Sequence, residues 1–270
     1  MLQTATKTRS ETHGKFIWTE LMTSDTSAAG EFYSAVIGWK VTQVPMPDLP
    51  SYFLFEMGEG DNCPGIGGMM HFPPELEGQI PPNWTGYVAV DDVDETCRDY
   101  LANGGRVQRE PEDIPGIGRF AVVADPSCAV LCIMKPIPPE NPPRELGPYD
   151  PGNVGWRELY AGNGEEAFEF YSKIFGWTKD NDYDMGPMGT YRVFAHGGDM
   201  TGGMMTKPEG VPMSCWCYYF IVDAIDAAIE RVTAGGGQIV NGPVEVPGGS
   251  WIVQALDPQG AFFCLSAGKR

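Results

Sequence analysis

The chain has 270 residues, of which 36 are acidic and 18 are basic, so its net charge is −18. A surface this acidic repels phosphate backbones and anionic lipid head groups, and no run of Lys and Arg offsets it, which argues against nucleic-acid or membrane binding. Hydrophobic residues make up 42% of the chain, enough for packed cores and too many for a disordered chain. The length suggests about two domains of ~100–200 residues each.

The chain begins with a polar segment. Residues 1–9 lack the ~7–15-residue apolar stretch of a secretory signal, and no later stretch approaches the ~18 apolar residues of a membrane helix. The seven cysteines are odd in number and lie mostly in apolar runs, which favours reduced, buried thiols over a disulfide framework. We therefore expect a cytoplasmic protein with a flexible N-terminal tail over residues 1–13.

Strand and helix periodicities alternate along the first half of the chain. The pattern predicts a strand over 15–23 and a helix over 26–37, with Asp25 as the N-cap and Gly38 as the residue that ends the helix. A second helix is predicted directly after residues 91–92. The other apolar segments predict strands over 38–44, 51–57, 65–71, 84–91, 106–110, 118–124 and 129–135. The resulting order is β-α-β-β-β, twice over.

The second half of the chain repeats the first. Trp18-Thr19-Glu20-Leu21 returns as Trp156-Arg157-Glu158-Leu159, and Gly68-Met69-Met70 returns as Gly203-Met204-Met205. Further along, Tyr87 matches Tyr219 in the same order. A repeat that takes in half of the chain predicts two copies of one structural unit.

A proline-rich segment separates the two copies. Residues 136–151 contain seven prolines in sixteen positions, which predicts a semi-rigid, extended spacer because proline lacks the backbone donor. We therefore divide the chain into domain 1 over 14–136, a Pro-rich linker over 137–151 and domain 2 over 152–268.

Several short motifs recur in both copies. They are a strand that ends before Asp25, Glu31-Phe32-Tyr33 with Gly38-Trp39 after it, the segment from Tyr87 to Asp92, and Asp125-Pro126 before the last strand. With these motifs the chain resembles the vicinal oxygen chelate superfamily, which includes glyoxalase I, extradiol dioxygenases and bleomycin-resistance proteins. It is similar in particular to a bacterial two-domain branch labelled glyoxalase-like or hydroxylase-like. The resemblance implies an α+β fold of two tandem domains, each made of two β-α-β-β-β modules whose curved mixed sheets surround a cavity.

Metalloenzymes of this superfamily hold a divalent ion with His, Gln or Glu on inward-facing strand positions. The resemblance places three such positions in each copy, at Trp18, Thr85 and Cys132 and at Trp156, Cys217 and Cys264. None of these residues is the expected ligand, and the three histidines of the chain form no pair at ligand spacing. The sequence therefore predicts a protein without a bound metal or other cofactor.

Glu20 and Glu158 each lie two residues beyond a tryptophan. Strand alternation points each such Trp and Glu into the cavity together, while Leu21 faces the helices. Burial raises the pKa of a carboxyl group, which suits a general base or a ligand-anchoring acceptor. The alternative is a structural role in which each glutamate caps backbone donors or pairs with an arginine, such as Arg119 or Arg192.

The same alternation predicts an aromatic, methionine-rich wall, which suits a flat apolar or cationic organic ligand. For any one of these residues, a plain filled core is the alternative. The residues that we expect to contact the ligand are Trp18, Tyr52, Met69, Thr85, Tyr87 and Cys132 in the first copy, and Trp156, Tyr191, Met204, Cys217, Tyr219 and Cys264 in the second.

Three cysteines of the second copy invite a different interpretation, as a zinc site at Cys215, Cys217 and Cys264. Residues two apart on a strand are roughly 6.5–7 Å apart, whereas two thiolates on one tetrahedral zinc approach to about 3.8 Å. The distance argues against zinc and against a local disulfide, and favours buried thiols. A reactive thiol at Cys132, Cys217 or Cys264 is the remaining alternative.

The function expected from these features is the binding of a small apolar or aromatic molecule without a metal, as in the drug-sequestering members of the superfamily. The first alternative is an enzyme, either a glyoxalase-like lyase or isomerase or an oxygenase, that uses Glu20 or Glu158 as its base. The second is a structural or regulatory protein that acts through its acidic surface. Because the two domains pair within one chain, we expect a monomer.

Overall fold

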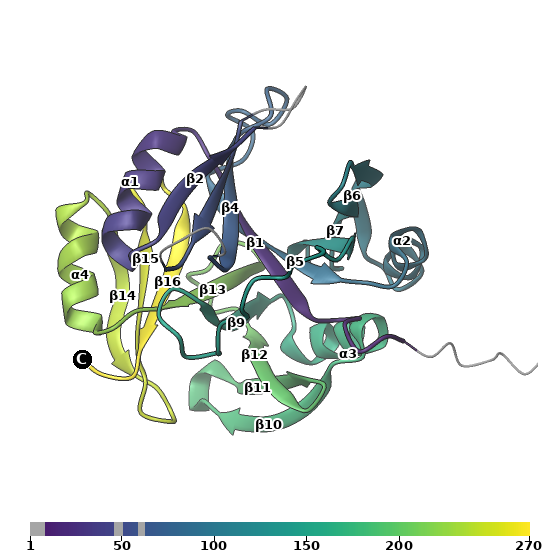
Figure 1. Cartoon of the computed structure of the whole chain (residues 1–270). Helices are drawn as coiled ribbons and strands as arrows, with labels where there is room; N and C mark the ends of the chain where they lie inside the picture. Colours follow the sequence, from purple (N-terminus) through teal and green to yellow (C-terminus); the bar gives the residue numbers. More distant parts are fainter. Residues whose placement is uncertain (1–8, 46–50, 59–62) are drawn as a thin grey trace, which may run out of the picture.

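Two eight-stranded sheets, one in each half of the chain, form the framework of the protein (Figure 1). The structure, a computed structural model, describes residues 9–45, 51–58 and 63–270. Domain 1 contains β1 (Phe16–Thr23), α1 (Thr26–Ile37), β2 (Lys40–Val44), β3 (Tyr52–Glu56), β4 (Gly65–His71), β5 (Asn83–Ala89), α2 (Val93–Ala102), β6 (Arg106–Ile114), β7 (Gly118–Ala124) and β8 (Val130–Pro136). Domain 2 contains β9 (Val154–Ala161), α3 (Gly164–Phe175), β10 (Thr178–Asp184), a 3-10 turn (Gly186–Met188), β11 (Thr190–His196), β12 (Asp199–Thr206), β13 (Cys215–Ile221), α4 (Ile225–Ala234), β14 (Gln238–Glu245), β15 (Trp251–Leu256) and β16 (Phe262–Ala267).

Each sheet is made of two β-α-β-β-β modules joined at its centre. The strand order is β2-β3-β4-β1-β5-β8-β7-β6 in domain 1 and β10-β11-β12-β9-β13-β16-β15-β14 in domain 2. The first strands of the two modules, β1 and β5, are antiparallel, and each pairs on its other side with the last strand of its own module in parallel. This arrangement confirms the predicted α+β fold of two tandem domains.

The helix ends follow the expected local chemistry. Helix α1 covers the predicted residues 26–37, the carboxylate of Asp25 accepts from the backbone N–H of Ala28 at 3.0 Å, and Gly38 ends the helix at φ 94°. In the second copy, Asn163 caps α3 and Gly176 ends it at φ 76°. No helix in the described ranges is long and apolar enough to span a membrane.

One strand is longer than predicted. The strand expected over 106–110 continues to Ile114 as β6, although Pro111 lies within it. Strand β6 is at the edge of its sheet, and its pairing with β7 shifts register between Arg109 and Glu112. A proline is tolerated there because a bulge on an edge strand does not need its N–H.

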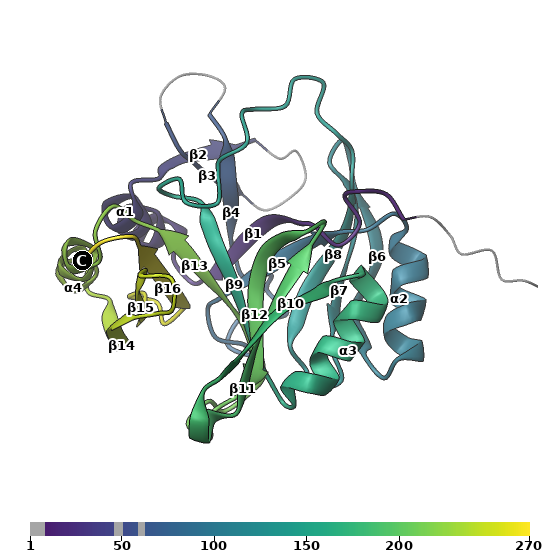
Figure 2. The same cartoon turned by 90° about the horizontal axis from the view of Figure 1, so that it is seen from below.

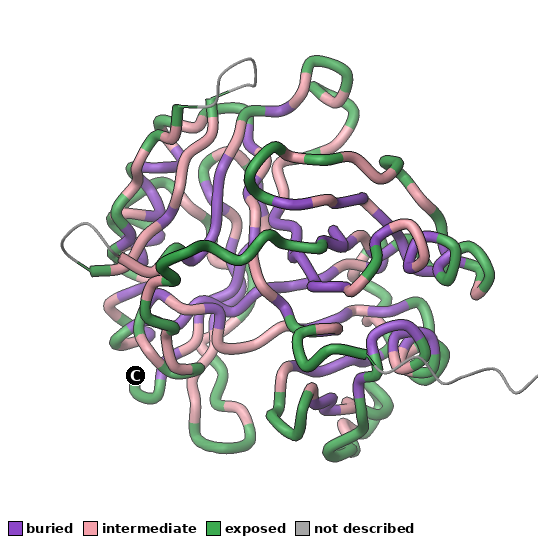
Figure 3. Tube along the Cα trace, turned by 45° about the vertical axis from the view of Figure 1, so that its right-hand side comes forward, coloured by how far each residue is buried: buried purple, intermediate pink, exposed green. Residues whose placement is uncertain are grey.

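The two domains pack against each other, and each helix lies beside one helix of the other domain. Helix α1 lies beside α4, and helix α2 lies beside α3, in both views of the protein (Figures 1 and 2). The buried segments are concentrated on the strands and the inner sides of the helices, and one core cluster takes in residues from both domains (Figure 3). Within this core, the Tyr33 hydroxyl donates to Asp257 at 3.0 Å, and its counterpart Tyr171 donates to Asp125 at 3.3 Å.

The N-terminal segment differs from the flexible tail that we predicted over residues 1–13. Residues 1–8 lie outside the described part, but residues 9–13 are bonded to the rest of the protein. Arg9 donates to the carbonyl of Lys173, and the His13 ring is 2.9 Å from the carbonyl of Ile174. The prediction is therefore wrong for residues 9–13, because polar side chains find partners on domain 2.

We expect Tyr33→Phe to lower the free energy of unfolding by about 1–3 kcal/mol. The Tyr33 hydroxyl donates to Asp257 and accepts from the Trp84 indole N–H at 2.9 Å, so its removal leaves the buried Trp84 N–H unpaired and takes one donor from the Asp257 carboxylate, which keeps two backbone N–H donors. Urea unfolding measures the change. Tyr149→Phe is the control because Tyr149 is 76% exposed. An equal effect of both variants would contradict a bridging role for Tyr33.

Candidate functional site

In domain 1, a glutamate on the central strand β1 is held by two tyrosines. Glu20 and Trp18 point to the same face of the sheet, while Leu21 faces the core. The Tyr52 hydroxyl donates to Glu20 Oε2 at 2.9 Å, and the Tyr87 hydroxyl donates to Oε1 at 3.0 Å. The Trp18 indole N–H donates to the Tyr52 hydroxyl at 3.0 Å. We call these four residues the Glu20 cluster and the face that carries them the site face.

Domain 2 carries the same arrangement on β9. The hydroxyls of Tyr191 and Tyr219 donate to Glu158 at 2.9 and 3.1 Å, and the Trp156 indole N–H donates to Tyr191 at 2.8 Å. These four residues form the Glu158 cluster. The sequence predicted that all eight residues line the site; the structure brings each set of four together and shows that their polar atoms bond to one another.

A glycine makes room for one tyrosine in each cluster. Tyr52 reaches Glu20 by crossing β4 at Gly68, where a Cβ would overlap the tyrosine hydroxyl. Gly203 on β12 lies in the same way beneath Tyr191. The repeated Gly-Met-Met motif therefore has a physical reason, since only glycine leaves the path of the ring open.

The surroundings of the two glutamates differ. In domain 2, the Gln254 amide donates to Tyr160 at 2.9 Å and to Tyr219 at 3.0 Å, and it accepts from Asn241 at 3.3 Å. Tyr160 lies on the same face of β9 as Glu158, two residues further along the strand. Glu158 is 7% exposed.

In domain 1, different residues occupy the equivalent positions, and two of the three are apolar. Met22 occupies the position equivalent to Tyr160, Val122 that of Gln254 and Arg109 that of Asn241. Glu20 is only partly buried. The Arg109 guanidinium lies 5.1 Å from the centre of the Phe120 ring and pairs with Glu112, and its charge lowers the pKa of Glu20. Met22, Val122 and Arg109 were not among the predicted site residues, although matching the two copies position by position would have revealed them.

Apolar side chains surround the Glu20 cluster on the site face. A small buried group is packed there together with partly buried neighbours. Its members are Tyr87, Phe120, Cys132 and Met134, with Ile17, Trp18, Ile114 and Val122. Thr85 pairs with Glu20 across the strands and is 8% exposed. In domain 2, Cys217, Tyr219 and Cys264 form the corresponding group.

Two predicted wall residues lie on the wrong side of the sheet. Met69 pairs with Leu21, and Met204 pairs with Leu159, so both methionines face the core, where they are fully buried. The prediction was wrong because the face of a strand residue depends on its register with its neighbour. The pairing with arginines was also wrong, since Arg119 bonds to Asp94 and Arg192 to Asp182.

The metal-ligand positions implied by the resemblance do fall together on the site face. Trp18, Thr85 and Cys132 lie on β1, β5 and β8 at paired or neighbouring register positions. Tryptophan cannot coordinate a divalent ion, and threonine is a poor ligand. In the described ranges, no three His, Cys, Asp or Glu side chains are arranged to hold a metal. The residues present therefore do not fit the metal of the superfamily's enzymes.

The cysteines of the site face are buried thiols. Burial raises the pKa of Cys132 and Cys264. For Cys217, the hydrogen bond with Cys215 lowers the pKa, but the hydrogen bond with Cys264 and burial outweigh it, so the pKa is raised. A raised pKa keeps a thiol protonated at neutral pH, and the protonated form is a weak nucleophile. These observations favour packing over the alternative of a reactive thiol.

Burial raises the pKa of Glu20 and Glu158 above the usual value of 4.5, and the tyrosine hydrogen bonds only partly oppose this shift. The folded state therefore holds these protons more tightly than the unfolded chain does. It follows that the free energy of unfolding falls as pH rises from about 4.5 through the raised pKa values.

We expect Glu20→Gln to remove the Glu20 part of this pH dependence. The free energy of unfolding of the wild type, relative to that of the variant, should then decline as pH rises above 4.5. Urea unfolding at a series of pH values measures it. A difference that is constant or grows with pH would show that the pKa of Glu20 is not raised.

Paired β-α-β-β-β modules, with a matching cluster on each sheet, define a tandem protein of the vicinal oxygen chelate type. The family model of the Glyoxalase/Bleomycin resistance protein/Dioxygenase superfamily matches residues 15–133 and again 153–265. The chain belongs to this superfamily, and each of its domains is one copy of the family unit.

Similar proteins match both domains together. The protein named "Putative glyoxylase CFP32" of Mycobacterium tuberculosis (strain CDC 1551 / Oshkosh) is 32% identical over 252 residues, which cover 92% of each chain. "Anthracycline biosynthesis protein DnrV" of Streptomyces peucetius is 30% identical over 258 residues, 92% of this chain and 91% of the relative.

Two solved structures share the fold at low identity. The Mn(II)-bound glyoxalase from Novosphingobium aromaticivorans has a TM-score of 0.61 at 16% identity, covering 94% of this chain and 82% of the other. The 2,3-dioxygenase LapB from Pseudomonas sp. KL28 has a TM-score of 0.65 at 13% identity, covering 96% and 93%.

Proposed function

We propose that domain 1 binds a flat, largely apolar small molecule that carries a hydroxyl or amino group, and that it does so without a metal. The observation that carries this proposal is the Glu20 cluster itself. A single partly buried carboxylate, oriented by Tyr52 and Tyr87, stands among apolar side chains on the site face. Sites for small organic ligands are typically apolar with a few fixed polar groups.

Glu20 is suited to accept from a ligand. Its two oxygens together have about four acceptor positions, and the tyrosines occupy two of them. Gln254 and Tyr160 extend the hydrogen bonds of the Glu158 cluster, and neither has a polar counterpart in domain 1. Val122 occupies the position of Gln254, and Met22 occupies the position of Tyr160. The greater exposure of Glu20 also favours domain 1 as the binding site.

The neighbours of Glu20 favour an aromatic ligand. Trp18, Phe120 and the partly buried Ile114 and Val122 offer apolar surface, and Arg109 carries a cation at its edge. The relative named as an anthracycline biosynthesis protein supports this class, since anthracyclines are flat polycyclic compounds with hydroxyl groups.

A matched pair of ligands and a matched pair of variants test the proposal. The ligands are a dihydroxyanthraquinone with free hydroxyl groups and its dimethyl ether, which lacks donors; the variants are Glu20→Gln and Glu158→Gln. We expect calorimetric titration to show preference for the dihydroxy compound in the wild type and Glu158→Gln. Glu20→Gln should lose about tenfold in affinity for it, the effect of a charge-assisted hydrogen bond. Unchanged affinity in Glu20→Gln, or a loss confined to Glu158→Gln, would refute the proposal.

The raised pKa of Glu20 favours a second candidate function, proton abstraction next to a carbonyl group in a glyoxalase-like reaction. Under this candidate, the protein would exchange a ligand proton with deuterium from heavy water, and Glu20→Gln would abolish the exchange. NMR of a ketone-bearing aromatic compound follows this exchange. An exchange rate equal in the wild type and Glu20→Gln would eliminate Glu20 as the base.

A further inference from the structure

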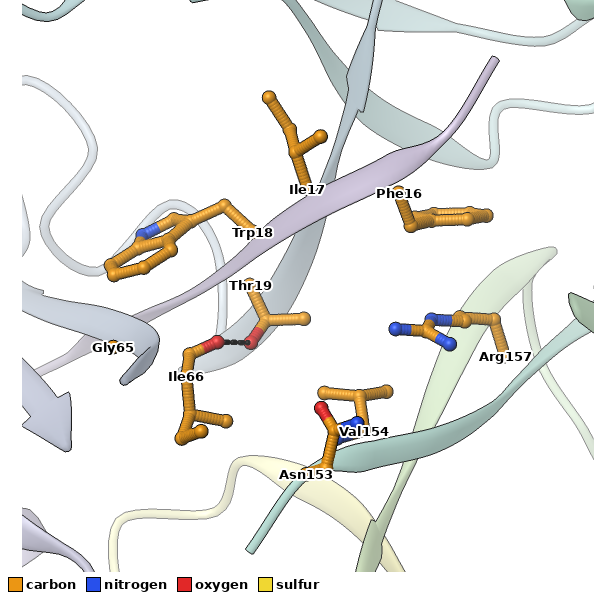
Figure 4. A pocket seen from close by; sticks show the side chains of 9 residues that line it. All are labelled: Phe16, Ile17, Trp18, Thr19, Gly65, Ile66, Asn153, Val154 and Arg157. Atoms are coloured by element: carbon orange, nitrogen blue, oxygen red, sulfur yellow. Dashed lines mark hydrogen bonds between the residues drawn. The ribbon is translucent and has the colours of Figure 1, made fainter. Parts of the chain in front are cut away.

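A cavity of about 110 Å³ lies between the two domains, and of the two clusters only the Trp18 side chain of the Glu20 cluster lines it (Figure 4). Residues 16–19 of β1 line one side of it, and Asn153, Val154 and Arg157 line the other. These two segments occupy matching positions of the repeat. The cavity is therefore built where the two copies face each other around their internal symmetry axis.

Arg157 breaks the symmetry of this cavity. Its counterpart in domain 1 is Thr19, a buried residue whose hydroxyl donates to the carbonyl of Ile66 at 3.3 Å. Figure 4 shows the Arg157 guanidinium pointing into the space between Thr19 and Val154. The guanidinium carbon of Arg157 lies over the Phe16 ring, 5.5 Å from the ring centre.

The charge of Arg157 faces the Phe16 ring but has no anionic partner within the described residues. No hydrogen bond or ion pair of Arg157 is found there, and its Nε atom is buried without an acceptor. Among the residues that the structure describes, no Asp or Glu lines the cavity, although the chain has twice as many acidic as basic residues. Burial lowers the pKa of Arg157 to about 10, which still leaves it charged at neutral pH. Arg157 is partly buried, and a charge that is partly removed from water is unfavourable unless it is compensated.

We propose that this cavity binds a small oxyanion, a carboxylate or an inorganic phosphate, on the guanidinium of Arg157. The planar fork of donors in arginine matches two oxygens of such an anion. The volume restricts the ligand to a few heavy atoms, since sites for larger organic ligands measure ~300–1,000 Å³.

The other polar side chains that line the cavity already have hydrogen-bond partners, so Arg157 is the group available to bind the anion. The Asn153 amide donates to the carbonyl of Gly147 at 2.8 Å, and its oxygen accepts from the N–H of Val154 at 2.8 Å. The Thr19 hydroxyl is committed to Ile66. Recognition therefore depends on charge and size. This site is separate from the Glu158 cluster, because Arg157 and Glu158 point to opposite faces of β9.

Anion-dependent stability tests the proposal. Sodium formate and sodium phosphate are titrated separately into the protein at constant ionic strength, with sodium chloride as the balance, while thermal unfolding is followed. The variants are Arg157→Met, which removes the charge but keeps the apolar stem, and Arg98→Met, which removes an exposed positive charge elsewhere. We expect at least one oxyanion to raise the melting temperature of the wild type and Arg98→Met with saturation, and to act at least about tenfold more weakly on Arg157→Met. The arm that saturates at the lower concentration identifies carboxylate or phosphate as the natural class.

Either of two results would overturn the proposal: no saturable effect of either oxyanion on the wild type, or an equal effect on Arg157→Met. A second measurement does not depend on the stability of that variant. The Nε–H signal of Arg157 in ¹⁵N NMR spectra, assigned by its loss in Arg157→Lys, should shift when the effective oxyanion is added. A signal that stays in place at saturating formate and phosphate would also refute the site.

Discussion

Replacing Gly68 by alanine is expected to destabilise the protein by about 3 kcal/mol and to remove ligand binding in domain 1. A Cβ at this position would occupy the place of the Tyr52 hydroxyl and overlap its ring. The ring must therefore leave its position, which breaks the bonds of Tyr52 with Glu20 and Trp18 together. Urea unfolding and the anthraquinone titration measure the two effects.

Two further variants separate this effect from the general cost of losing a glycine. Gly210→Ala is the control, because nothing lies within 4 Å of a Cβ there. The double variant with Tyr52→Ala should be less destabilised than the sum of its two single variants, since the clash disappears with the ring. Additive effects would mean that Tyr52 does not depend on Gly68.

Glu158→Gln is expected to destabilise the protein by about 2 kcal/mol more than Glu20→Gln does. Both hydroxyls that donate to Glu158 also accept hydrogen bonds, Tyr191 from Trp156 and Tyr219 from Gln254. Neither can accept from a new amide group without losing a bond. In domain 1, no counterpart of Gln254 donates to Tyr87, so this hydroxyl can turn to accept from the amide.

Chemical unfolding of the two variants near neutral pH compares these costs directly. In domain 2, Tyr219 could accept from the new amide group only if the side-chain amide of Gln254 reversed. The amide of Asn241 would then have to reverse as well, because Asn241 donates to Gln254. Equal destabilisation by the two substitutions would show that the Gln254 network does not lock the Glu158 cluster.

The fold could be predicted from the sequence because the sequence patterns that indicate each helix and strand occur in both copies of the repeat. The helix over 26–37, its cap at Asp25 and its end at Gly38 follow from short-range chemistry and match the structure. The bonds of residues 9–13 with domain 2 could not be predicted in this way. They depend on how the two domains are placed, which local patterns do not contain.

Part of the site was also within reach of the sequence. Alternation along one strand places Trp18 beside Glu20, and Tyr87 follows on the paired strand. Met69 was assigned to the wrong face because its orientation depends on the register between β1 and β4. Tyr52 was predicted to line the site, but its bond with Glu20 was not, because Tyr52 reaches Glu20 from a third strand through the gap at Gly68.

The two clusters have the same four residues but different surroundings, which indicates how the copies diverged. Domain 2 closes its glutamate behind Tyr160 and Gln254, and domain 1 leaves Glu20 partly exposed beside Val122. We infer that the copy with fewer internal hydrogen bonds kept the capacity to bind a ligand.

The metal content of the protein and its effect on ligand affinity test the central claim most directly. Tag-free protein is analysed for zinc, nickel, iron and manganese, and the dihydroxyanthraquinone is titrated before and after dialysis against a chelator. We expect far less than one metal ion per chain and the same affinity in both titrations. A divalent metal bound near one per chain, with affinity that is lost on chelation and restored by the metal, would contradict the account.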